Sequence, residues 1–106
     1  MEREENIRNT FRYIAGSYYG IRELDEYSLK EFVLKDIKDY LDNFVLENPI
    51  KNFDFDKEFV QVDSDLDLKT KLQDSLLVLP KIGASMELVL LVKKRIKLID
   101  SEKKRK

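Results

Sequence analysis

Three aspartates at alternate positions are the residues of this chain whose spacing first suggests a chemical role. Asp63, Asp65 and Asp67 form an Asp-x-Asp-x-Asp pattern, which is how the calcium-binding loop of an EF-hand begins. The pattern then departs from that loop. Leu68 stands where the sharp turn needs a glycine, and Asp74 stands where a glutamate binds calcium through both oxygens. We therefore expect no calcium site, and we interpret the three carboxylates as a solvated or ion-paired face.

The residue types that most often perform catalysis are missing. The chain has no histidine and no cysteine, which removes the commonest general base, the commonest zinc ligand and every thiolate site. Asp54, Asp56 and Asp63 are candidates for an acid–base pair, but the sequence places no pocket or partner beside them. The three glycines are too scattered for a phosphate-binding loop. The sequence thus predicts a protein that is not an enzyme and that uses no metal and no cofactor.

Positive charge is concentrated near the C-terminal end. Residues 93–106 carry a net charge of +6, although the net charge of the 106-residue chain is −1, and residues 54–67 contain six acidic residues and one lysine. A frayed, solubilising tail is one interpretation of the basic end. The others are binding to a nucleic-acid phosphate backbone and docking on an acidic protein surface, such as residues 54–67 of another copy. The tail residues concerned are Lys103, Lys104, Arg105 and Lys106.

Two amphipathic helices are predicted in the N-terminal half. The second spans Tyr27–Asn48 and is expected to begin with a capping box of Ser28 and Glu31. Its apolar arc covers more than half of its circumference, so we expect it to be the central element. The first spans residues 2–21 and stops near Gly20, and the short connection predicts an antiparallel hairpin. The apolar face of the first helix recurs at helical spacing, at Ile7, Phe11, Ile14 and Tyr18.

After the second helix, the period of the apolar residues changes to that of a strand. From Phe59 to Leu72 apolar and polar residues alternate, which predicts a strand with one buried face, and Leu76–Leu79 predicts a second, shorter strand. The segment Met86–Ile99 fits a strand and also fits a helix. The strand is favoured, because the segment is rich in Leu and Val and follows a turn that contains proline and glycine. The helical alternative would line one side with Leu88, Leu91, Val92, Ile96 and Ile99.

The strand interpretation brings an acidic row against a basic row. The acidic row is Asp63, Asp65 and Asp67, and the basic row is Lys93, Arg95 and Lys97. Antiparallel pairing of these strands would set unlike charges opposite each other, at roughly a few tenths of a kcal/mol per pair. The rows would also fix the register, because a slip by one residue exchanges the two faces of a strand.

The second half of the chain resembles a known family in the order of its predicted elements. An FVQVD strand is followed by the apolar LLVL, a proline and the Glu-led apolar MELVLL. This order is similar to the last domain of contractile phage tail sheath and related tail-assembly proteins. The chain departs from that family at the long Asp/Lys strand and at the basic tail. The resemblance implies a structural role in a phage tail or virion.

The sequence predicts one α+β domain over residues 1–100 and a basic tail over residues 101–106. In that domain a two-helix hairpin packs on an antiparallel sheet of about three strands. The predicted function is a non-enzymatic assembly subunit or adaptor that works by protein–protein contacts, as a homo- or hetero-oligomer. The alternative is a nucleic-acid-associated accessory protein that uses the tail. No membrane contact is expected, since the longest apolar run is Leu88–Val92. We expect a location in the cytoplasm or within a virus-like particle, and no secretion.

Overall fold

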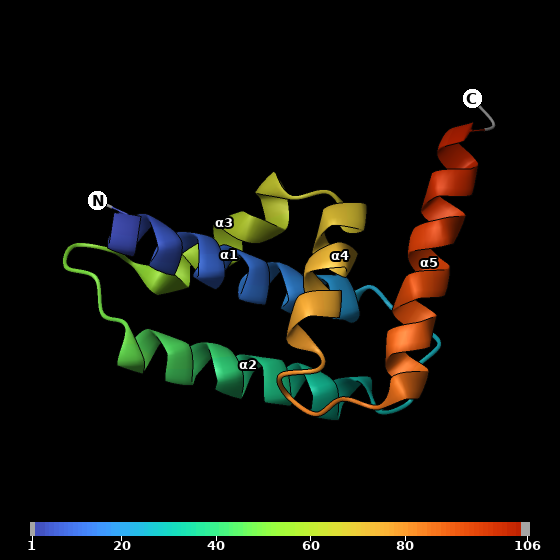
Figure 1. Ribbon diagram of the computed structural model, residues 1–106, viewed down its shortest axis with the longest axis horizontal. Helices are drawn as coiled ribbons and strands as arrows, with labels where there is room; N and C mark the ends of the chain where they lie inside the picture. Colours follow the sequence, from blue (N-terminus) through green and yellow to red (C-terminus); the bar gives the residue numbers. More distant parts are fainter. Residues whose placement is uncertain (1, 105–106) are drawn as a thin grey trace.

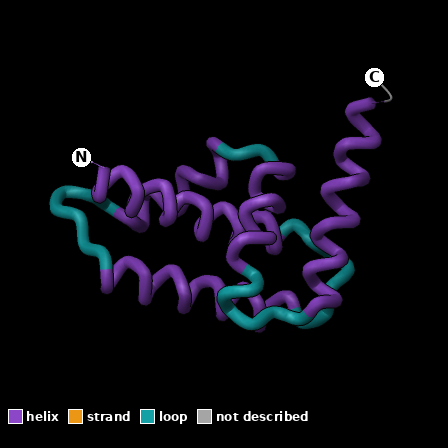
Figure 2. Tube along the Cα trace, in the orientation of Figure 1, coloured by secondary structure: helices purple, strands orange, loops and turns teal. Residues whose placement is uncertain are grey.

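The computed structural model describes residues 2–104, and for Lys104 the backbone alone. Within these residues all regular structure is α-helical and no strand is present, as Figure 2 shows. The predicted α+β fold with an antiparallel sheet is therefore wrong. The elements are α1 (Glu2–Arg22), α2 (Lys30–Glu47), α3 (Phe55–Asp65), α4 (Leu68–Val78) and α5 (Met86–Lys104).

The helix around which the others are arranged is α1. It packs against α2, α3 and α4, whereas α5 packs chiefly against α4 at one end of the molecule (Figure 1). The helices α1 and α2 run antiparallel, which confirms the predicted hairpin. The expectation that the second helix is the central one is wrong. Its apolar arc is wider than its buried face, and Phe32 within that arc is 70% exposed.

The backbones of α1 and α4 come close together where the two helices cross. Gly20, which was expected to end the first helix, lies inside it, because α1 continues to Arg22. A Cβ atom added to Gly20 would lie 2.8 Å from the backbone carbonyl carbon of Lys71 on α4. The absent side chain is therefore what allows the two backbones to touch.

Aspartates cap two of the helices. Asp54 accepts a hydrogen bond from the backbone N–H of Lys57 (3.2 Å) at the start of α3. Asp67 accepts one from the N–H of Thr70 (2.7 Å) at the start of α4. Such caps satisfy backbone donors that have no partner within the helix. The capping box predicted at Ser28 is not formed, because α2 begins two residues later without a side-chain cap.

The predicted strand from Phe59 to Leu72 is in fact two short helices separated by a break. The break falls at residues 66–67, where Asp67 starts α4, and it shifts the apolar face of the second helix relative to the first. The combined pattern then imitates a period of two. Burial distinguishes the two structures, since Val62 is fully buried while Val60, on the same face of a strand, is exposed.

The segment Met86–Ile99 adopts the helical alternative. Leu88 and Val92, four residues apart, are fully buried, whereas Met86 and Leu90, which a strand would also have buried, are exposed. The physical reason lies in length and composition. The segment is longer than a typical strand, and Leu, Met, Lys and Arg all favour a helix.

The resemblance to phage tail sheath proteins depended on the predicted strands. The residues of FVQVD lie in α3, those of LLVL lie at the end of α4, and those of MELVLL form the first turns of α5. The order of strands that carried the resemblance is therefore absent from the described residues. The implied role in a phage tail or virion loses its support.

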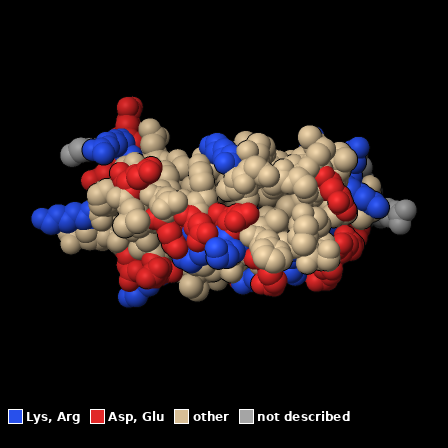
Figure 3. Space-filling model, turned by 90° about the horizontal axis from the view of Figure 1, so that it is seen from below, with Lys and Arg blue, Asp and Glu red and all other residues tan. Residues whose placement is uncertain are grey.

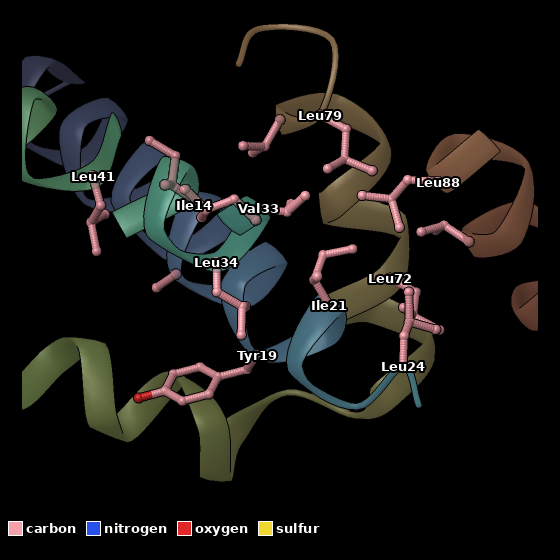
Figure 4. Close-up of a cluster of buried hydrophobic side chains, with 14 of the residues drawn as sticks. Ile14, Tyr19, Ile21, Leu24, Val33, Leu34, Leu41, Leu72, Leu79 and Leu88 are labelled. Atoms are coloured by element: carbon pink, nitrogen blue, oxygen red, sulfur yellow. The ribbon is translucent and has the colours of Figure 1, made fainter. Parts of the chain in front are cut away.

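The hydrophobic core follows the two faces of α1. Figure 4 shows Ile14 of α1 beside Val33 and Leu34 of α2. On the other side of the core, Leu79 at the end of α4 and Leu88 of α5 point toward each other. The core thus continues from α1 through α4 to the inner side of α5. None of the described helices has the length and hydropathy needed to cross a bilayer.

Candidate docking surfaces

The acidic and basic rows predicted to pair across a sheet do not meet. Both segments are helical, and within residues 2–104 no ion pair joins Asp63, Asp65 or Asp67 to Lys93, Arg95 or Lys97. The predicted pairing is therefore wrong. An ion pair that does join α4 to α5 has the opposite polarity, because Lys69 of α4 contacts Asp100 of α5 at 2.6 Å.

Asp63 is the centre of a charged network inside the fold. Its carboxylate accepts hydrogen bonds from Lys71 of α4 and from Arg22 of α1, both at 2.7 Å. The hydrogen bond from Lys71 is the main reason that the pKa of Asp63 lies below its ordinary value, and the bond from Arg22 lowers it further. Lys71 is buried, and it also donates to the Asp63 carbonyl oxygen at 2.9 Å. Asp63 therefore ties three helices together.

The other two aspartates of the predicted row have separate roles. Asp65 accepts hydrogen bonds from Gln61 (2.9 Å) and from Arg12 of α1 (3.3 Å), and these bonds, that from Gln61 first, lower its pKa. Asp67 caps α4. The hydrogen bond from the Thr70 N–H is the largest cause of its lowered pKa. The charge of Lys103 on α5 contributes to the same shift. No cluster of three potential metal ligands occurs among the described residues.

Asp74 is a carboxylate whose environment opposes its charge. It lies on α4 against Gly16 of α1, so close that a Cβ added to Gly16 would stand 2.8 Å from its Oδ2 atom. Burial raises the pKa of Asp74 from 3.8 to about 6. The folded chain therefore prefers the neutral acid, and the stability that this preference contributes is lost as pH rises from about 4 through about 6.

Substitution of Asp74 by asparagine is expected to raise the melting temperature at pH 7.5 and to leave it nearly unchanged at pH 4.5. Each pH unit between the two pKa values corresponds to ~1.4 kcal/mol, and partial solvent access reduces the total gain to about 1–2 kcal/mol. Thermal unfolding at the two pH values measures it. The control Asp36→Asn, at an exposed position of α2, should change neither value. An equal gain at both pH values would show that the charge of Asp74 is not the cause.

The side of α5 next to its buried stripe carries two leucines between basic residues. Leu91 and Leu98 are seven residues apart and thus lie on one line along the helix, with Lys94 and Arg95 about 50° to either side. Together with Glu26 of the α1–α2 connection they line a depression of about 340 Å³. Leu98 is 47% exposed. We call Leu91, Lys94, Arg95 and Leu98 the α5 face.

The remaining basic residues singled out in the sequence lie elsewhere on α5 or beyond the described part. Lys93 and Lys97 are exposed on the outer side of α5, and Lys103 is exposed in its last turn. The helix continues through residues 101–104, so the first part of the predicted tail is helical. The side chain of Lys104, and Arg105 and Lys106 entirely, lie outside the described residues.

A second apolar surface is a groove between α2 and α3. Both of these helices pack against α1, and Phe11 of α1 lies between them and lines the groove. The groove has a volume of about 290 Å³ and carries acidic groups on both rims, Asp42 on α2 and Asp56 on α3. We call it the α2–α3 groove. Its lining residues are Phe11, Lys38, Leu41, Asp42, Val45, Leu46, Phe55, Asp56 and Phe59.

Lys38 is the basic residue on the rim of this groove. Its ammonium contacts Asp42 at 3.1 Å and stands 4.9 Å from the centre of the Phe59 ring. The side of the molecule seen in Figure 3, where α2 lies, accordingly shows acidic and basic side chains interspersed with uncharged ones. The exposed apolar residue of the groove is Leu46, at 78%.

Sequence reasoning found the basic residues of α5 but missed both surfaces. Prediction of the α5 face required residues 86–99 to be interpreted as a helix, because Leu91 and Leu98 share a side only in a helix. Prediction of the groove required a helix that begins at Phe55 and packs beside α2, whereas the sequence was interpreted as a strand from Phe59 onward. The sequence did contain a signal for the helix that forms the groove, because an aspartate such as Asp54 is a typical N-cap residue.

Comparison with known proteins adds no relative. No protein family matches the chain, and neither the curated proteins nor the solved structures contain a match. The geometry of its own residues carries the functional argument.

Proposed function

We propose that this chain is a non-enzymatic subunit or adaptor of a larger protein assembly, and that the α5 face is its docking surface. The observation that carries the proposal is the hollow beside α5, in which the half-exposed Leu98 and the partly buried Leu91 lie between two basic side chains. A helix packed against one neighbour needs one apolar stripe, and α5 already uses Leu88 and Val92 for that purpose. Leu91 and Leu98 form a second stripe beside the first, and a second stripe is typical of a helix that contacts a partner.

The chemistry of the face specifies the partner. Lys94 and Arg95 flank Leu91 and Leu98, and Glu26 is the one acidic residue beside them, so a complementary surface is apolar at its centre and mainly acidic at its edges. Two α5 faces do not complement each other, because their basic flanks would repel. Whether the assembly forms in the cytoplasm or within a particle stays a prediction.

Nucleic-acid binding is the second candidate. The observation that favours it is the exposure of Lys93, Lys94 and Lys97 along one side of α5. Leu91 and Leu98 lie beside Lys94, and they favour a protein partner over a nucleic acid, because a phosphate backbone offers them no apolar surface to contact.

The test compares two leucine substitutions in the chain recovered from its own cells with an affinity tag. Leu98→Asp places a charge on the α5 face, and Leu77→Asp is the matched control on α4, where Leu77 is 57% exposed and lies outside the face. We expect the wild type and Leu77→Asp to retain a stoichiometric protein partner after nuclease treatment. We expect Leu98→Asp to lose it, with an affinity reduced at least about tenfold.

Two results would contradict the proposal. One is equal recovery of the partner by Leu98→Asp and the wild type. The other is loss of all association on nuclease treatment, which would favour the nucleic-acid candidate. In that case binding of the purified chain to duplex DNA or RNA should weaken steeply with salt, as release of counterions requires.

A further inference from the structure

We propose that the contact between α4 and α1 at Asp74 and Gly16 is a pH-sensitive joint, which is closed while the Asp74 carboxyl is neutral and opens locally once that carboxyl is ionised. This inference goes beyond the docking role of α5 and does not depend on it. The carboxyl of Asp74 lies against the backbone of α1 at Gly16, in the space that a side chain at Gly16 would occupy. We call this contact the α1–α4 joint.

The joint lies between two other points at which α1 is contacted from the same part of the chain. Three residues before Asp74, the backbone of α4 at Lys71 lies against Gly20. Beyond the end of α4, the ammonium of Lys81 donates a hydrogen bond to the hydroxyl of Tyr13 at 3.2 Å. The carboxyl of Asp74 is therefore held between the two helices and not at a free helix edge.

Asp74 has no partner for its charge within residues 2–104, where no hydrogen bond or ion pair reaches its carboxyl. The apolar side chain of Leu66 lies at the same place, since a Cβ added to Gly16 would stand 3.1 Å from the Leu66 Cδ1 atom. The charged and titratable groups of α1, α3, α4 and α5 around the joint are engaged elsewhere. These are Arg12 with Glu58 and Asp65, Arg22 and Lys71 with Asp63, Lys69 with Asp100, Lys81 with Tyr13, and Tyr19 beneath Arg22.

A carboxylate without a donor or a cation beside it is costly to keep away from water. Burial is what raises the pKa of Asp74 to about 6. When α4 moves off α1, the carboxyl reaches water and its pKa returns toward the ordinary 3.8. The closed form binds the proton more tightly, so it loses stability relative to the open form as pH rises from about 4 through about 6, and the balance is constant above that.

Opening of the joint exposes backbone amides, because α4 is not stable without its neighbour. It has 11 residues, and isolated helices shorter than about 12–15 residues are marginal in water. Leu72, Ser75 and Val78 of α4 are fully buried, so their amides report opening and not surface fraying. Exchange that depends little on urea identifies a local opening, whereas exchange through unfolding of the whole chain depends on it steeply.

The experiment measures amide hydrogen exchange by NMR at pH 4.5 and pH 7.5, with urea concentrations below the unfolding transition. Rates are divided by those of an unstructured chain at the same pH, which gives protection factors. The proteins are the wild type, Asp74→Asn, whose side chain is neutral at both pH values, and Asp36→Asn, the control at an exposed position of α2. Circular dichroism checks that each variant is folded.

We expect the α4 amides of the wild type and of Asp36→Asn to lose protection about tenfold between pH 4.5 and pH 7.5, with little dependence on urea. In Asp74→Asn the protection of the same amides should stay nearly constant with pH, because the group that titrates is absent.

Three outcomes would overturn the inference. Equal protection of the wild-type α4 amides at both pH values would show that the carboxylate turns into water without movement of α4. An equal loss of protection in Asp74→Asn would assign the pH effect to another group. A urea dependence in α4 as steep as that of the amides of Ile37 and Leu41, which are buried in α2, would show that α4 opens only when the whole chain unfolds.

Discussion

Replacement of Gly20 by alanine is expected to destabilise the fold by about 3 kcal/mol, although it adds a single methyl group. The new Cβ would stand 2.8 Å from the carbonyl carbon and 2.9 Å from the carbonyl oxygen of Lys71. These are backbone atoms inside α4, so relief requires that whole helix to move away from α1. Because α5 packs on α4, such a movement would also displace α5. Urea unfolding followed by circular dichroism measures the loss.

Gly16 provides the matched comparison on the same side of α1. A Cβ at Gly16 meets the end of the Asp74 side chain at 2.8 Å, and that side chain can turn away. Alanine also favours a helix over glycine by about 1 kcal/mol. We therefore expect Gly16→Ala to cost at most about 1 kcal/mol. Equal losses for the two variants would contradict the close backbone approach at Gly20.

Removal of Asp63 is expected to cost about 3 kcal/mol, more than removal of its partner Lys71. The Lys71 side chain is 9% exposed, so Asp63→Ala leaves a buried ammonium group with only a carbonyl oxygen as its acceptor. Lys71→Met removes the buried charge and keeps an apolar stem, while Asp63 retains its bond to Arg22. We expect Lys71→Met to cost about 1 kcal/mol. Urea unfolding at pH 7 ranks the two variants.

The control for this pair is Asp65→Ala, on the same helix but at the surface. Its bonds to Arg12 and Gln61 are exposed to solvent, so its loss should have little effect. The pKa of Asp63 lies below its ordinary value because of Lys71, and its contribution to stability is therefore present above that ordinary value and lost as pH falls. A larger loss for Lys71→Met than for Asp63→Ala would contradict the buried network.

The N-terminal half could be predicted from the sequence because its signals are local. The apolar residues of residues 2–21 and 27–48 keep a helical period over five turns, and the short connection leaves one arrangement. The position of α1 at the centre was not predictable in the same way. That position depends on Gly20, which allows α4 to pack closely on α1. A single glycine creates no periodic pattern, and this one was interpreted as the end of a helix.

The C-terminal half was misjudged for a physical reason. Alternating charges from Asp63 to Lys71 imitate a strand, but Asp67 is a helix cap and Lys71 is a buried ion-pair partner. Residues 86–99 satisfied two periods at once. The arrangement was decided by burial of Leu88 and Val92 against α4, a tertiary contact that no local pattern contains. The docking surfaces consist of residues that these helices bring together. Because the helices were not predicted, the surfaces were not predicted either.

The reactivity of a single thiol tests the role of the α5 face most directly. The chain has no cysteine, so Leu98→Cys and Leu77→Cys each introduce one unique alkylation site, on the face and on α4. The rate of alkylation is measured in the complex recovered from cells and in the dilute purified chain. We predict that assembly slows alkylation at position 98 at least about tenfold and leaves position 77 unchanged. Equal rates at position 98 in both samples would contradict a docking role for α5.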